Sequence, residues 1–336
     1  MRCPAVLIAW IAVSACDGSA PRLTELSAVE PVDGGGFPGL LNPGAITVDQ
    51  VGRVHVGDNG DRQIKTFDAE GRPLAARGGT GSGPGEFRSI QGLVAVAGHL
   101  VVLDPLLDRL VTFDSLGVAT LLPRPEAVDF IGAAGPDAFL LANSALWALR
   151  AGAAPLLLRL GLDGRVRSEI GRRRAAANPF VGHIRNFAIA AGTADGALLW
   201  VAFLNDTTLL RHSVATGAWA EVSRPAPFAF RRLADDFRPS ATSLAPGRRS
   251  APPFDAVTLD IAVDARGTAY VLTALEPAGG EATTVAVDIA AADDRAIRRY
   301  LVSTNATRIG VSPDGGRLYL LDATTGMVRT FALPGR

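Results

Sequence analysis

Three aspartates recur at matching places in the chain and could form a set of carboxylates for metal binding or acid–base chemistry. Asp58 and Asp104 lie 46 residues apart, and Asp322 has the same place in a third copy of the pattern. Each follows a short apolar run and precedes a turn, where aspartate favours hydrogen bonds to nearby backbone groups. We therefore predict that these carboxylates hold turns and do not carry a reaction.

The other residues with chemical potential lack the spacing that a site needs. The glycine-rich run 78–85 has the composition of a phosphate-binding loop, but neither a following Lys-Ser/Thr pair nor a G-x-G-x-x-G pattern is present. The histidines, His55, His99, His183 and His212, do not occur at metal-ligand spacing. There is also no G-x-S-x-G nucleophile motif. A polar site would have to be assembled from residues distant in sequence.

The elements that carry the three aspartates are short strands in a repeat. The repeat consists of an Asp, an apolar residue six positions later and a Phe three positions after that. Two copies also have a Gly four positions after the Phe. The three copies are Asp58, Ile64, Phe67 and Gly71, then Asp104, Leu110, Phe113 and Gly117, and finally Asp322, Val328 and Phe331. Runs of four to six apolar, often β-branched residues between Gly or Asp turns predict strands. A repeat of about 40 to 50 residues with about four strands is typical of β-propeller blades.

These residues resemble the NHL-repeat class of six-bladed β-propellers, in particular its bacterial lipoprotein members. The resemblance rests on three stretches: Val56-Gly57-Asp58, Ile64-Lys65-Thr66-Phe67-Asp68, and the connector Gly78-Gly79-Thr80-Gly81-Ser82-Gly83-Pro84-Gly85-Glu86-Phe87. It is close over residues 34–117, good over 255–273 and 304–331, and loose between them. It implies an all-β fold.

The chain departs from the NHL pattern at one position. Family copies carry Arg just before the third strand, where Arg109 fits. The first copy has Gln63 there with Arg62 one step earlier, and the last has Met327. A functional role for this Arg therefore does not follow from the resemblance.

The repeat predicts an all-β, six-bladed β-propeller closed by an N-terminal strand. Beyond the first two copies, the predicted blades cover 127–170, 186–222, a segment beginning at Ile261, and 308–333. The last blade ends too early for a fourth strand, and an unpaired edge would be exposed to other chains. We predict that residues 23–29 supply that strand beside Val328 and Phe331, a closure that the resemblance also implies.

The N-terminus predicts export and a lipid anchor. Met1 and Arg2 precede an apolar run, 4–15, that is too short to span a bilayer and has the size of a signal-peptide core. Val13-Ser14-Ala15-Cys16 resembles the bacterial lipobox, in which the Cys carries acyl chains such as palmitate. We predict a signal peptide over 1–15, a lipid-anchored tether over 16–22 and a propeller over 23–336. A signal peptide cut without lipidation, or a buried strand, is the alternative.

This interpretation predicts the cellular location but leaves the choice between inner and outer membrane open. The protein would lie in the bacterial cell envelope, attached to a membrane through lipid on Cys16. Cys3 lies within the signal, so the mature chain has no disulfide and no cysteine metal site. The 33 basic and 33 acidic residues balance, which gives no electrostatic basis for nucleic-acid binding. We expect a monomer.

A proline-rich loop, 223–253, interrupts the repeat between the fourth and fifth blades. Its six prolines exclude a continuous strand. We predict one or two helical turns over 231–237. The loop is either a surface connection or a lid or partner-docking loop, since long loops in compact domains often have a function.

The propeller fold places the residues before each first strand around one mouth of the axial channel, together with the loops between second and third strands. These residues lie near Asn42, Gln91, Asp129, Asn186, Asp260 and Arg308, and the loops add Asp61, Arg62, Asp108, Arg109, Trp147, Asn205 and Asp206. Two hypotheses follow from this set.

The hypothesis that we favour is a non-catalytic binding module for a protein, peptide or glycan of the envelope, without a cofactor. Arg and Trp dominate binding hot spots, so the candidate ligand-binding residues are Arg62, Arg109, Trp147, Arg185 and Arg308. The alternative is a calcium-dependent hydrolase or lyase similar to the gluconolactonase-like and paraoxonase-like propellers. Its oxygen ligands would be Asn42, Asp129, Asn186 and Asp260.

Overall fold

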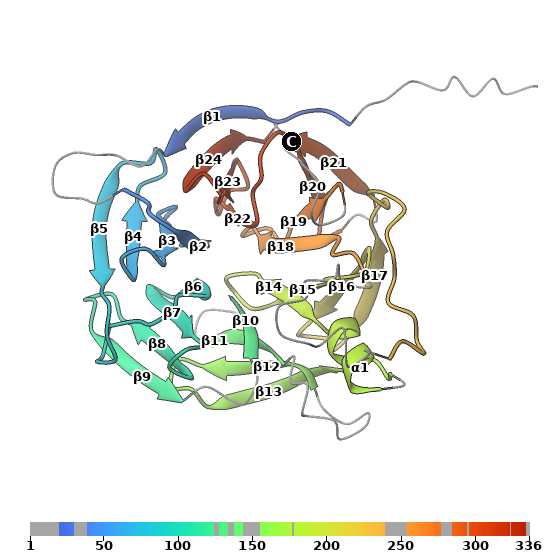
Figure 1. Ribbon diagram of the computed structural model, residues 1–336, viewed down its shortest axis with the longest axis horizontal. Coiled ribbons are helices and arrows are strands. Elements are labelled where there is room, and N and C mark those ends of the chain that lie inside the picture. The colour runs from blue at the N-terminus through green and yellow to red at the C-terminus, as the bar shows by residue number, and fades with distance from the viewer. Residues whose placement is uncertain are drawn as a thin grey trace, which may run out of the picture.

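The computed structural model describes residues 20–29, 39–123, 128–133, 138–143, 155–176, 178–238, 254–276, 284–293, 296–322 and 324–333. These residues form a β-propeller, a ring of twisted sheets around an axis (Figure 1). The strands make six four-stranded sheets. The predicted signal peptide (1–15), Cys16, Trp147 and residues 239–253 lie outside the described part of the chain.

Each sheet is antiparallel, and five of them are built from four consecutive strands. The first two contain β2 (Pro43–Val48), β3 (Val54–Asp58), β4 (Gln63–Phe67) and β5 (Pro73–Gly78), then β6 (Gly92–Val96), β7 (His99–Asp104), β8 (Arg109–Phe113) and β9 (Ala119–Pro123). The next two contain β10 (Val128–Ala133), β11 (Ala138–Asn143), β12 (Pro155–Gly161) and β13 (Val166–Arg172), then β14 (Ala188–Gly192), β15 (Leu198–Phe203), β16 (Thr208–Ser213) and β17 (Trp219–Ser223). The fifth contains β18 (Thr258–Val263), β19 (Ala269–Ala274), β20 (Val285–Ala290) and β21 (Ile297–Val302). The last contains β22 (Arg308–Val311), β23 (Arg317–Asp322), β24 (Met327–Ala332) and β1 (Thr24–Val29).

In the first sheet, burial falls from the middle strands to the outer edge. All five residues of β3 are buried, whereas the outer strand β5 has only exposed and half-buried residues. In the sheets whose burial is described, the second and third strands carry buried Val, Leu, Ile and Phe, and these side chains pack between neighbouring sheets. The core is a series of apolar layers around the ring.

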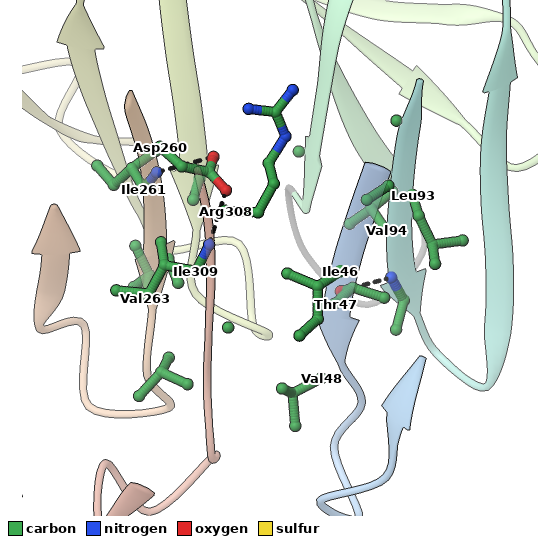
Figure 2. Close-up of a pocket in the computed structure, with 18 of the residues that line it drawn as sticks. Ile46, Thr47, Val48, Leu93, Val94, Asp260, Ile261, Val263, Arg308 and Ile309 are labelled. Carbon is green, nitrogen blue, oxygen red and sulfur yellow. Dashed lines mark hydrogen bonds between the residues drawn. The ribbon is translucent and has the colours of Figure 1, made fainter. Parts of the chain in front are cut away.

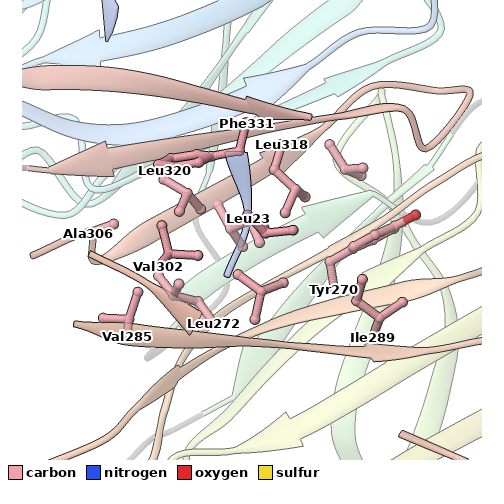
Figure 3. Close-up of a cluster of buried hydrophobic side chains, with 13 residues drawn as sticks. Leu23, Tyr270, Leu272, Val285, Ile289, Val302, Ala306, Leu318, Leu320 and Phe331 are labelled. Atoms are coloured by element: carbon pink, nitrogen blue, oxygen red, sulfur yellow. The ribbon is translucent and has the colours of Figure 1, made fainter. Parts of the chain in front are cut away.

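The N-terminal strand closes the ring. Figure 1 shows β1 beside β24, and the register pairs Thr24 with Ala332 and Val29 with Val328. Leu23 inserts between the fifth and last sheets, against Phe331 and Leu318 (Figure 3). Burying such a side chain contributes about 1.5–3 kcal/mol. The predicted pairing of residues 23–29 with the strand of Val328 and Phe331 is confirmed.

The three repeated aspartates hold turns, as predicted. Each carboxylate accepts N–H groups from the connector that enters its sheet and from the turn after its own strand. The donors are Leu41, Asn42 and Gly60 for Asp58, then Arg88, Ser89, Leu106 and Leu107 for Asp104, and Asn305, Thr324 and Thr325 for Asp322. The repeat thus encodes a fixed link between connector and turn.

The helix prediction for 231–237 is wrong. Within residues 224–238 and 254–257 the structure has no helix, because Arg231 bonds Asp255 through its N–H and its side chain, and the Leu233 N–H donates to Asn205. The one helix of the described chain is α1 (Pro179–Arg185), which the sequence analysis missed. At seven residues it is too short to cross a membrane.

Candidate functional site

Two hollows lie on the side of the ring that carries the connectors between sheets. Because neighbouring strands alternate in direction, every first strand begins and every second strand ends on this side, here called the connector face. One hollow is the axial channel. The other, here called the rim pocket, lies beside the fourth sheet.

The side chains that line the axial channel are mostly apolar. Its cavity of about 140 Å³ is lined by first strands, with Ile46, Val48, Leu93 and Val263 among its side chains (Figure 2). The polar side chains among the described lining residues are Thr47, Gln91, Asp260 and Arg308. The channel therefore offers few polar side chains to a ligand.

Asp260 is the buried charged group of this channel. Its Oδ1 accepts the N–H of Ile261 at 2.9 Å, and its Oδ2 accepts the N–H of Ile309 at 3.0 Å, which joins two neighbouring sheets. Burial raises the pKa of Asp260 to about 6, although Arg308 and these N–H groups act in the opposite direction. Such a carboxyl could transfer protons near neutral pH, but its contacts also give it a structural role.

The rim pocket is a larger cavity of about 370 Å³, and more of its lining side chains are charged. Four segments build it: the connector after β13, helix α1, the turn after β15, and the beginning of the proline-rich loop. Its lining residues are Arg174, Ile184, Arg185, Phe203, Asn205, Asp206, Arg232, Leu233, Ala234 and Asp235. Three guanidinium groups thus face two carboxylates.

Arg174 and Asp206 form the fixed part of this pocket. The Arg174 guanidinium lies 3.8 Å from the centre of the Phe203 ring, and its Nη1 is 2.9 Å from Asp206 Oδ2. Asp206 also accepts the N–H of Thr208 at 3.0 Å. Burial alone would raise the pKa of Asp206, but Thr208 and Arg174 hold it below its usual range. This carboxylate stays ionised at neutral pH.

The other two arginines are less tightly held. Arg185 donates to the Ala175 carbonyl at 3.1 Å and forms an ion pair with Asp235. Arg232 lies 3.9 Å from Asp206 Oδ1, with two-thirds of its side chain exposed. Their positions leave them able to contact a ligand.

Two asparagines fix the walls of the rim pocket. Asn186 accepts the Arg174 N–H at 2.6 Å and donates to Gly182 O at 2.8 Å, which ties the connector to α1. Asn205 accepts the Leu233 N–H at 3.1 Å and donates to the Asp255 carbonyl at 2.6 Å, which holds the proline-rich loop. Helix α1 and this loop share an apolar cluster that includes Ile184 and Leu233. The pocket is therefore pre-formed.

The structure separates the arginines that the sequence analysis grouped. Arg62 bonds Asn59 within its own turn. Arg109 donates to the carbonyls of Ser82, Gly83 and Glu86 at 2.7, 3.1 and 2.6 Å, so it braces the glycine-rich connector. Arg308 lines the axial channel and Arg185 the rim pocket. Trp147 lies outside the described residues.

Arg174 and Arg232 were not among the residues predicted from the sequence. Both belong to arginine clusters, 172–174 and 231–232, that flank the irregular fourth sheet. Clustered arginines beside a long loop were the available signal.

The residues of the alternative calcium site are also dispersed. Asn186 is fully engaged by backbone groups, and Asn42 contributes its N–H to Asp58. Asp260 lies in the channel beside Arg308, whose positive charge opposes a divalent cation there. The side chain of Asp129 lies outside the described part. In the described residues no three His, Cys, Asp or Glu side chains form a group suited to a metal ion.

No protein-family model and no curated protein matches the chain. Several solved structures do match the chain. A putative exported protein from Bacteroides fragilis is 11% identical, covers 93% of this chain and 95% of its own, and superposes with a TM-score of 0.59. A DUF4221 family member from Bacteroides vulgatus is 11% identical over 93% and 98% of the two chains, with a TM-score of 0.58. Virginiamycin B lyase from Staphylococcus aureus is 11% identical over 87% and 95%, with a TM-score of 0.49. The first two similarities show a shared propeller fold.

Proposed function

We propose that this protein is an exported, lipid-anchored, six-bladed propeller of the NHL type that binds a ligand without catalysing a reaction. The observation that carries the proposal is the rim pocket, in which arginines from three separate segments surround a cavity of about 370 Å³. Arginine gives large contact area and oriented hydrogen bonds, which suits recognition. The ligand is a protein, peptide or glycan of the envelope that presents an anionic group.

The side chains of the axial channel favour the proposal of a binding protein over that of an enzyme with its active site on the axis. Asp260 is the channel's one described carboxylate, and backbone N–H groups from two sheets already occupy both oxygens. A calcium-dependent hydrolase or lyase would need several oxygen ligands to converge. Asn186, one of those proposed, is held by α1 and its connector instead.

The proposed cellular location rests on the N-terminal sequence. Cys16 follows the lipobox-like residues Val13, Ser14 and Ala15, and lipid on Cys16 would hold the propeller at a membrane. The similarity to a putative exported protein supports export.

Affinity capture tests the proposed function. The full-length protein, purified in detergent, would be used to capture partners from the envelope fraction, with Arg185→Ala/Arg232→Ala as the test variant. Its matched control is Arg72→Ala/Arg165→Ala, since both side chains are exposed on turns between third and fourth strands, on the opposite side of the ring. We expect the rim variant to lose a partner that the control retains. Equal capture by both variants would refute the rim pocket as the binding site.

A further inference from the structure

The two aspartates of the rim pocket differ in how firmly they are held. Asp206 is 16% exposed and is bound by Arg174 and the Thr208 N–H. Asp235 is 79% exposed and meets the pocket through its ion pair with Arg185. Exposed ion pairs contribute little free energy. Asp206 is therefore part of the pocket wall, whereas Asp235 can be displaced.

Displacing Asp235 would leave the pocket strongly positive. Arg174, Arg185 and Arg232 carry three positive charges against the two negative charges of the aspartates, an excess of one. Without Asp235 the excess is two. Arg174 is already matched by Asp206 and the Phe203 ring, so the uncompensated charge lies on Arg185 and Arg232.

Two largely buried apolar side chains contribute to the lining beside these two arginines. Ile184 and Leu233 line the same cavity, and each is only 8% exposed. A planar guanidinium matches the two oxygens of a carboxylate, which gives geometric specificity as well as charge. The pocket thus combines a carboxylate-binding group with the exposed edges of two apolar side chains, which an aliphatic side chain of a ligand would contact.

We propose that the rim pocket recognises the free C-terminal carboxylate of a peptide chain that ends in an aliphatic residue, and that Asp235 occupies the place of this carboxylate when no ligand is bound. The inference rests on the proposed function, because it concerns the same pocket. It adds the chemical class of the ligand, and it identifies Asp235 as a group of the same chain that competes with the ligand for Arg185. A side-chain carboxylate of Asp or Glu has the same charge but has no branched aliphatic side chain on the carbon next to it.

Calorimetric titration of the full-length protein in detergent tests this inference with three small probes. N-acetyl-leucine carries the carboxylate and the aliphatic group, N-acetyl-leucinamide lacks the charge, and N-acetyl-glutamic acid α-amide carries a side-chain carboxylate alone. We expect N-acetyl-leucine to bind more tightly than either of the others. Tighter binding of the glutamic acid probe, or equal binding of the neutral amide, would overturn the assignment.

Substitutions separate the role of Asp235 from that of the arginines. Asp235→Asn should tighten N-acetyl-leucine binding about three- to five-fold, as expected for loss of an exposed ion pair. Arg185→Gln should abolish binding in both the wild-type and the Asp235→Asn background. Unchanged affinity in Asp235→Asn would contradict the competitor role.

The two proposals fail in different ways. If the rim variant loses its envelope partner while no probe binds, the proposed function stands and the C-terminal assignment is wrong. If no envelope partner depends on the rim, the proposed function is wrong.

Discussion

Replacing Lys65 by valine should destabilise the propeller, even though the second sheet has valine at the corresponding position. Lys65 is the only lysine in the chain, and its side chain is fully buried. Its Nζ donates to Asp58 Oδ2 at 2.7 Å and to the Gly39 carbonyl at 2.6 Å, and lies 2.8 Å from Asp61 Oδ2. One cation thus serves two carboxylates.

The size of the effect follows from that arrangement. Removing one partner of a buried ion pair costs about 3–5 kcal/mol, because the other charge stays buried and unpaired. In the second sheet Val111 replaces Lys65, Leu107 replaces Asp61, and Asp104 is satisfied by backbone N–H groups alone. Lys65→Val/Asp61→Leu reproduces this arrangement and should therefore be more stable than Lys65→Val by about 1–3 kcal/mol.

Urea unfolding followed by tryptophan fluorescence measures both variants, since the buried Trp200 reports on the core. Burial alone would raise the pKa of Asp58, but Lys65 and backbone N–H groups hold it below its usual value. The stability that Lys65→Val loses relative to the wild type should therefore become smaller as pH falls and Asp58 protonates. A loss below about 1 kcal/mol in Lys65→Val, or a double variant no more stable than the single one, would refute the reasoning.

Three further predictions concern the channel, the closure and the anchor. The folded-state pKa of Asp260 is about 6, above its ordinary 3.8, so the folded protein binds more protons between these values and its stability should fall as pH rises from 4 to 6. Asp260→Asn should remove this loss of stability. If the melting temperatures of the wild type and Asp260→Asn changed with pH in the same way, the prediction would be contradicted. A chain that begins at residue 34 lacks β1, so its melting should lose cooperativity, and an unchanged transition would count against closure by β1. Cys16→Ser should move the protein from the membrane fraction to soluble or precursor forms, whereas continued dependence on detergent would argue against lipidation.

The parts of the fold that could be predicted are those encoded by local repetition. The step from Asp58 to Phe67 recurs from Asp104 to Phe113 because the aspartate links the same connector and turn in both sheets. The missing fourth strand of the last sheet predicted the pairing of β1 with β24 because an unpaired edge is unfavourable.

The site could not be predicted in the same way, because it lies where the repeat is lost. The fourth sheet lacks the repeated Asp-to-Phe step, and Asn186 and Asn205 organise its connector and the adjoining loop instead. Helix α1 did have a local signal, since Asn178 caps it and Pro179 begins it. The directions of Arg62 and Arg109 could not be read from spacing, because carbonyl groups of nearby turns hold their guanidinium groups.

Hydrogen exchange with and without the captured envelope partner tests the central claim most directly, namely that the ligand binds at the rim pocket. The account predicts slower exchange in α1 and in residues 231–235 when the partner is bound, with the N–H groups of Ile261 and Ile309 in the axial channel unchanged. Protection confined to the channel strands β18 and β22, with no change in α1, would contradict it.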